Sequence, residues 1–175
     1  MNAVKNNSPA KKTAYGGILA ACALIFLFLA TILPTNRIFF YGLSSVFIAV
    51  MILEYGTTAG WMFYFSTSLL ALIIIPHKIR LIPYILVLGH YGILKTLIER
   101  LNNRFFEAIL KLMVLNIGFL LAYLTVTMLL AVKINFLFHP AFIIIAVQPL
   151  FFVYDFVFTL FIRFYLDRIK PAIKN

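Results

Sequence analysis

The sequence predicts an all-α protein whose chain crosses a membrane six times in one compact bundle, with both termini in the cytoplasm. Of its 175 residues, 64% are hydrophobic and only 11% are charged, whereas soluble proteins are about one-quarter charged. The apolar residues also fall into continuous runs of about 20, the length of a membrane-spanning helix. These runs lack the alternating pattern of a β-barrel strand, so the spans are expected to be helical.

The first half of the chain contains a polar tail and three spans. Residues 1–13 are polar, and we expect them to be disordered or to lie at the membrane surface. The first span covers residues 14–33 and is too long, without a small-residue cleavage site, for a signal peptide. The second span, 38–53, is short, and the residues 54–56 form a tight turn into the third span at 58–75.

The second half of the chain contains three more spans and a basic tail. Residues 76–80 interrupt the chain before the fourth span, 81–98. The fifth span, 105–132, is expected to begin as an interfacial helix in which Glu107 and Lys111 pair at i,i+4 spacing. The sixth span covers residues 140–163. The transmembrane domain therefore occupies residues 14–163, residues 164–175 form a basic cytoplasmic tail, and no soluble domain is expected.

The orientation follows from the distribution of the 15 basic residues. One side of the membrane carries eleven of them, namely Lys5, Lys11, Lys12, Lys95, Arg100, Arg104, Lys111, Arg163, Arg168, Lys170 and Lys174. The other side carries Arg37, Lys78, Arg80 and Lys133. The positive-inside rule places the first side in the cytoplasm, together with both termini. We therefore attribute the net charge of +10 to orientation rather than to nucleic-acid binding, and expect a multi-pass protein of a bacterial plasma membrane.

Several function classes are not expected. The single cysteine, Cys22, excludes a disulfide or a thiolate metal cluster within one chain. His90 has no second metal-binding residue three or four positions away, which favours a buried histidine over a metal ligand. The chain also lacks the short motifs of metalloproteases, serine hydrolases, phosphate-binding loops and redox dithiols. We expect no enzymatic activity, no metal and no cofactor.

Asp155 lies about 22 Å into the sixth span, where an ionised carboxylate requires a partner. Lys95 and Lys111 are the available cations, and the pairing has two interpretations: a buried ion pair that fixes helix packing, or a proton relay or substrate contact. Polar residues also recur at helical spacing on the last three spans, where they either line a cavity or join helices by hydrogen bonds. They are Tyr84, Tyr91 and Lys95; Asn116, Tyr123 and Thr127; and Gln148, Asp155 and Thr159.

Small residues occur at four-residue spacing at the start of the first span, as Gly16 and Ala20 and as Gly17 and Ala21. Such a stripe lets a second helix approach closely. The second helix lies either within the same bundle or in a separate subunit, and the sequence supports both interpretations.

Six spans in under 180 residues, cytoplasmic termini, and the Ala-Tyr-Gly-Gly-Ile-Leu-Ala-Ala segment at 14–21 together resemble the substrate-binding S component of energy-coupling factor (ECF) vitamin transporters. The resemblance implies a small-molecule ligand and a partner transmembrane coupling subunit that sits on two ATPases. It implies docking through Gly16, Gly17, Ala20 and Ala21, which stand where the family has an Ala-x-x-x-Ala-like stripe. It also implies a site near the outer surface, at Arg37, His77, Lys78 and Arg80, with Tyr84, Tyr123 and Gln148 below.

The outer side also indicates the charge of the ligand. It carries Arg37, His77, Lys78, Arg80, Lys133 and His139, with no carboxylate. We predict a small anionic or zwitterionic aromatic ligand there, with contact to lipid headgroups as the alternative role of these cations. Two other functions remain open. One is a non-transporting scaffold of an envelope complex, similar in span count to the rod-shape protein MreD. The other is a lipid-handling subunit, which would have basic residues in a groove that opens sideways to the lipid.

The predicted topology is tested by cysteine labelling in a chain whose Cys22 is replaced by alanine. Cysteines introduced at Asn36 and Asn135 should react with an impermeant thiol reagent added to intact cells, and a cysteine at Asn102 should react only after lysis. This outcome follows from the excess of basic residues on the cytoplasmic side. The reverse labelling pattern would overturn the orientation.

Overall fold

The computed structural model describes residues 9–33, 35–101, 103–129 and 140–171. Within them, six helical segments are long and apolar enough to cross a membrane: α1 (Pro9–Ile32), α2 (Arg37–Tyr55), α3 (Thr57–Ile74), and the segments Lys78–Leu101, Arg104–Met128 and Ile145–Ile169. No strand occurs in this part of the chain. The prediction of an all-helical chain with six apolar spans is confirmed. Lys133 and His139, with most of the polar tail, lie outside the described residues, as do the labelling positions Asn102 and Asn135.

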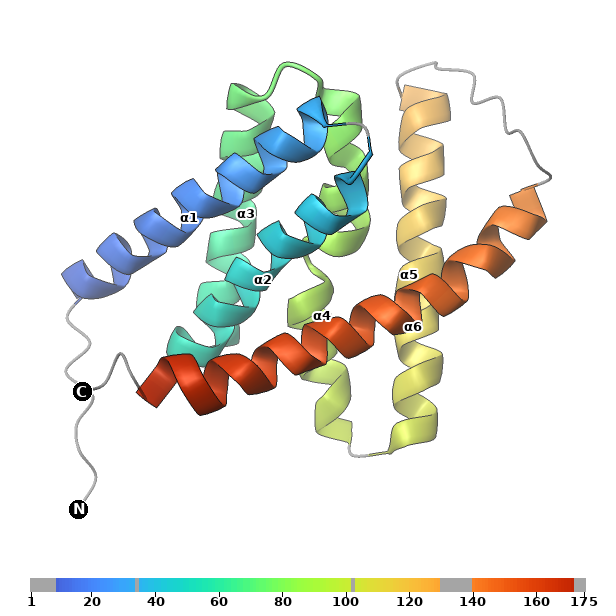
Figure 1. The fold of residues 1–175 in the computed structure, drawn as a ribbon. Coiled ribbons are helices and arrows are strands. Elements are labelled where there is room, and N and C mark those ends of the chain that lie inside the picture. The colour runs from blue at the N-terminus through green and yellow to red at the C-terminus, as the bar shows by residue number, and fades with distance from the viewer. Residues whose placement is uncertain (1–8, 34, 102, 130–139, 172–175) are drawn as a thin grey trace.

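Helices α1, α2 and α3 pack against one another and against the fourth span (Figure 1). Their shared core contains Leu27, Ile48, Ile75, Leu81 and Tyr84, all almost completely buried. Gly56 turns the chain between α2 and α3 with φ of 87°, a left-handed value that glycine adopts without steric cost. Large apolar side chains also cover the outside of the helices; Ile73, for example, is 79% exposed. An apolar core inside an apolar exterior is what a helix bundle surrounded by lipid requires.

The fourth span, predicted at residues 81–98, is not one continuous α-helix. It consists of the 3₁₀ turn η1 (Lys78–Leu81), the π-helical turn η2 (Tyr84–Leu88), α4 (Tyr91–Ile98) and the 3₁₀ turn η3 (Glu99–Leu101). Residue 89 closes the π turn, since its amide donates to the carbonyl of Tyr84 at 2.6 Å. A Cβ on Gly89 would lie 2.8 Å from the Tyr64 ring and 2.9 Å from that carbonyl oxygen. Packing against α3 therefore favours glycine and a widened turn here.

The fifth span consists of α5 (Arg104–Leu124), extended by the π-helical turn η4 (Thr125–Leu129). It packs against η2 through Gly118, where a Cβ would lie only 2.7 Å from the carbonyl oxygen of Leu86. A second core cluster, formed by Val87, Tyr91, Leu115 and Phe151, joins the fourth, fifth and sixth spans.

The sixth span consists of α6 (Pro140–Phe164) and the π-helical turn η5 (Tyr165–Ile169), and it crosses α4 and α5 obliquely in Figure 1. Its C-terminal end is attached to the end of α2, because the Lys170 ammonium contacts the Glu54 carboxylate at 3.1 Å. The hydroxyls of Tyr15 and Tyr165 are also 3.4 Å apart. The start of the first span and the end of the sixth therefore lie at the same end of the bundle.

The small-residue stripe on α1 divides between two environments. A Cβ on Gly16 would meet the Met51 side chain at 3.5 Å, and Ala20 packs against the main core. A Cβ on Gly17 would meet nothing within 4 Å, and Ala21 is exposed. Half of the stripe thus packs inside the bundle, and the other half is open on its surface.

The close approach of α5 to η2 predicts a specific steric effect. Gly118→Ala should force the two segments apart and lower the free energy of unfolding by about 1–3 kcal/mol, the usual cost of overpacking. Gly17→Ala is the matched control and should leave the stability unchanged or slightly raised. Thermal unfolding in detergent micelles, followed by circular dichroism, measures both; equal stability of the two variants would contradict the packing at Gly118.

Candidate functional site

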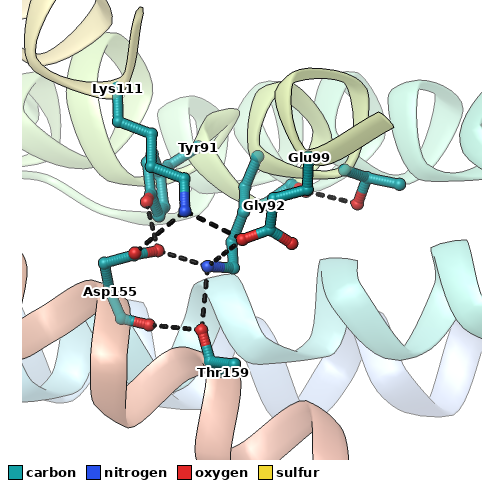
Figure 2. A network of polar contacts seen from close by, with 8 residues as sticks. Tyr91, Gly92, Glu99, Lys111, Asp155 and Thr159 are labelled. Carbon is teal, nitrogen blue, oxygen red and sulfur yellow. Dashed lines mark hydrogen bonds and ion pairs between the residues drawn. The ribbon is translucent and has the colours of Figure 1, made fainter. Parts of the chain in front are cut away.

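Four ionisable side chains from three spans meet where these spans pack: the largely buried Lys95 of α4, Lys111 of α5 and Asp155 of α6, and the more exposed Glu99 at the start of η3. We call them the charge cluster. The Lys95 residue is only 1% exposed and Lys111 only 6%. Figure 2 shows the side chains of Glu99, Lys111 and Asp155 converging from their separate helices.

Each lysine of the charge cluster contacts both carboxylates. The Lys95 ammonium lies 2.7 Å from Oε1 of Glu99 and also bonds Oδ1 of Asp155. The Lys111 ammonium lies 2.8 Å from Oε1 of Glu99 and 3.0 Å from Oδ2 of Asp155. Two cations and two anions alternate around a ring, so the fully ionised cluster has no net charge. Such compensation is required where ionised groups are removed from water.

Hydroxyl groups complete the hydrogen bonding of the charge cluster. The Tyr91 hydroxyl donates to Oδ1 of Asp155 at 2.5 Å. The Lys95 ammonium donates to the Thr159 hydroxyl at 2.9 Å, and this hydroxyl donates to the Asp155 carbonyl oxygen at 2.8 Å. The Tyr91 ring also contacts Phe151 and Phe158 edge to face, with centroids 5.0 and 6.0 Å apart. The aromatic rings lower the local dielectric constant, which strengthens the ion pairs.

The charge cluster is partly the site that the sequence predicted. The structure brings Asp155 together with Lys95 and Lys111, the two cations proposed for it, and Asp155 pairs with both. Glu99, at the end of the fourth span, also joins the cluster, although its side chain is still 39% exposed. Its i,i+4 spacing from Lys95 was the available signal.

The predicted pair of Glu107 and Lys111 is wrong. The Lys111 ammonium contacts Glu99 and Asp155 instead, on other helices. The i,i+4 rule describes side chains on an open helix surface, whereas Lys111 is buried between helices that bring two carboxylates to it.

A cavity of about 330 Å³ opens between α3, the fourth span and α5; we call it the lateral groove. It is lined by Trp61, Tyr64, Phe65, Ile85, Leu86, His90, Leu94, Val114, Ile117, Gly118 and Leu121. This lining contains one histidine, His90, and no lysine, arginine, aspartate or glutamate. The groove therefore presents apolar and aromatic walls with few polar groups, a composition typical of small-molecule sites.

The orientation of His90 follows from the π turn. The Ile85 carbonyl accepts a hydrogen bond from the Tyr64 hydroxyl at 2.6 Å and lies 3.3 Å from Nδ1 of His90. Because a carbonyl only accepts, Nδ1 must carry the proton of this hydrogen bond. In a neutral imidazole the other nitrogen, Nε2, is then an acceptor. Nε2 makes no hydrogen bond to the described part of the chain.

The four residues predicted to bind a ligand in the outer loops lie in different local environments. Arg80 donates from Nη1 to the carbonyl oxygen of Thr31, and its own carbonyl accepts from the Tyr41 hydroxyl. Its guanidinium thus caps the C-terminal end of α1, where unpaired carbonyls favour a cation. His77 and Lys78 are exposed, and Nε of Arg37 is buried without a hydrogen-bond partner among the described residues.

The three residues predicted below these loops lie in different surroundings. Tyr84 is completely buried in the main core, and Tyr123 is 45% exposed on α5. Gln148 is half-buried on α6. None of the seven predicted residues lines the lateral groove, which the sequence did not predict, and a site that unites them stays a prediction.

Comparison with family models, curated proteins and solved structures finds no match for this chain. Within residues 9–171, excluding the gaps in the description, no group of three or more His, Cys, Asp or Glu side chains is placed to hold a metal ion. The charge cluster and the lateral groove are therefore the two features from which function is argued.

The charge cluster makes a prediction about stability. Asp155→Asn leaves two buried ammonium groups with one carboxylate and should lower the free energy of unfolding by about 3–5 kcal/mol. Thermal or denaturant unfolding in micelles measures the change. Glu107→Gln is the control, since it removes one carboxylate from α5 outside the cluster and should have little effect.

A double substitution separates charge balance from packing. Asp155→Asn combined with Lys111→Met restores equal numbers of cations and anions, so it should be more stable than the sum of the two single effects predicts. Strict additivity, or an Asp155→Asn variant no less stable than Glu107→Gln, would show that the four charges do not act as one unit.

Proposed function

We propose that this protein is a membrane-embedded subunit that binds a small molecule and takes part in its uptake, with a separate module supplying energy. The observation that supports binding is the lateral groove of about 330 Å³. This volume lies at the lower end of the range of small-molecule sites, roughly 300–1,000 Å³.

The walls of the lateral groove indicate the chemistry of the ligand. The rings of Trp61 and Phe65 stack with centroids 5.7 Å apart, and Tyr64 lies against both. These flat aromatic walls favour a planar, apolar ligand. No charged side chain lines the groove, so burial of an ionised ligand would be uncompensated there. The groove thus favours an uncharged ligand, whereas an anionic ligand near the outer loops stays a prediction from the sequence.

His90 supplies the polar contact. With Nδ1 directed at the Ile85 carbonyl, Nε2 of the neutral ring accepts a hydrogen bond, so the ligand is expected to donate one, from a hydroxyl or an N–H group. The π turn that orients this ring supports the assignment, because such turns occur frequently at functional sites.

The energising module is proposed from the resemblance to ECF S components, together with the absence of a nucleotide-binding motif from the sequence. A transmembrane coupling subunit and ATPases are its proposed form, and the plasma membrane of a bacterium the proposed location. The exposed positions Gly17 and Ala21 supply a smooth surface on α1 that supports contact with such a partner. A non-transporting scaffold is the alternative, and it requires no ligand in the groove.

The single tryptophan of the chain lines the groove, so its fluorescence reports on occupancy. We expect 4-bromophenol, a planar uncharged donor, to quench Trp61 saturably in the purified protein. The matched probe 4-bromoanisole lacks the O–H donor and should bind about fivefold more weakly, the value of one hydrogen bond. His90→Ala should remove this difference between the two probes.

Filling the groove provides the control. Val114→Phe places a ring in the groove and should abolish saturable quenching by 4-bromophenol, whereas Val153→Phe, at a position 60% exposed on α6, should not. Mass spectrometry of the gently purified protein should also detect a co-purified small molecule that Val114→Phe loses. Equal quenching in the two variants, with no retained molecule, would favour the scaffold.

A further inference from the structure

A second hollow, of about 320 Å³, lies along one face of α6, away from the lateral groove. It is lined by Phe152, Asp155, Phe156, Thr159, Leu160 and Arg163, and we call it the α6 groove. The steps of three and one between these positions place all six on the same side of the helix. Asp155 therefore belongs both to this groove and to the charge cluster.

The α6 groove offers one uncompensated positive charge. The Asp155 carboxylate is balanced by its contacts with Lys95 and Lys111, and Thr159 already donates and accepts hydrogen bonds. Arg163 is exposed and makes no hydrogen bond or ion pair with the described residues. The cluster and Arg163 together therefore carry a charge of +1, which a single negative charge complements.

The remainder of the α6 groove is apolar and open to the surroundings. Phe152, Phe156 and Leu160 are 42%, 64% and 47% exposed. They precede Arg163 by three to eleven residues, so they extend to about 16 Å from Arg163 along the helix, toward the middle of the span. Arg163 lies in the last turn of α6, where a long basic side chain reaches the headgroup region.

From this arrangement we propose that the α6 groove binds one phospholipid with a singly charged anionic headgroup, such as phosphatidylglycerol. The guanidinium of Arg163 binds the phosphodiester with paired N–H donors, and an acyl chain lies along Leu160, Phe156 and Phe152. The proposal is independent of the ligand of the lateral groove. It adds a lipid contact on the helix that the charge cluster attaches to the rest of the bundle.

The test uses native mass spectrometry of the purified protein in micelles with equimolar phosphatidylglycerol and phosphatidylcholine of the same chains. The wild type should retain one phosphatidylglycerol with a preference of about fivefold, the contribution expected of one basic residue beside an anionic lipid. Arg163→Gln should lose the preference, and Arg163→Lys should keep most of it. Arg168→Gln removes an exposed arginine five residues further on and should behave as the wild type.

A fluorescence measurement places the lipid. In a Trp61→Phe chain, Phe156→Trp puts the single tryptophan in the α6 groove, where phosphatidylglycerol with brominated chains should quench it more strongly than brominated phosphatidylcholine. Millimolar glycerol 3-phosphate should not compete, because it lacks the acyl chain. Equal retention of both lipids, equal losses in Arg163→Gln and Arg168→Gln, or competition by glycerol 3-phosphate would each overturn the proposal.

Discussion

The arrangement of the last three spans depends on the compensation of buried charge. Two ammonium groups and the Asp155 carboxylate lie between α4, α5 and α6, and none of the three is tolerable there alone; the Glu99 carboxylate, 39% exposed at the edge of the cluster, completes the charge balance. Each lysine contacts a carboxylate on each of two segments, so a shift of one helix breaks contacts to both others. The cluster therefore restricts α6 to a position in which Asp155 faces Lys95 and Lys111. Apolar packing alone is less specific, because one apolar side chain can replace another along a helix face.

The position of α6 in turn determines which surfaces are left open. The helix crosses the fourth and fifth spans obliquely, and aromatic contacts of Tyr91 with Phe151, Tyr154 and Phe158 support it on one side of Asp155. Gly92 allows the close approach, since a Cβ there would lie 3.0 Å from the Phe158 ring. The Tyr154 hydroxyl also lies 2.7 Å from that of Ser45 on α2. These contacts use one side of α6, and Phe152, Phe156 and Arg163 remain exposed on the α6 groove.

The two grooves differ in the charge that they accept, and local structure explains the difference. The lateral groove lies beside a π turn, in which the Ile85 carbonyl is hydrogen-bonded to the side chains of Tyr64 and His90. No lysine, arginine, aspartate or glutamate lines this groove. The α6 groove borders the charge cluster and contains a guanidinium outside it. An uncharged ring and an anionic lipid are therefore the occupants that the two environments favour, and both proposals follow from the cost of burying an unpaired charge.

The sequence by itself determined the class of the protein, because hydropathy is a local property that each span of about 20 residues expresses independently. It also determined that Asp155 required Lys95 or Lys111, since desolvation penalises an isolated carboxylate wherever the helix packs. Only the tertiary structure decided that both lysines contact Asp155, that Glu99 joins them and that Glu107 does not, because these contacts depend on how three helices rotate and cross. The same holds for Arg80: the sequence shows an arginine between the third and fourth spans, but not that the end of α1 lies within its reach. The lateral groove had no sequence signal either, since residues from 61 to 121 approach there only after Gly89 and Gly118 allow their helices to pack closely.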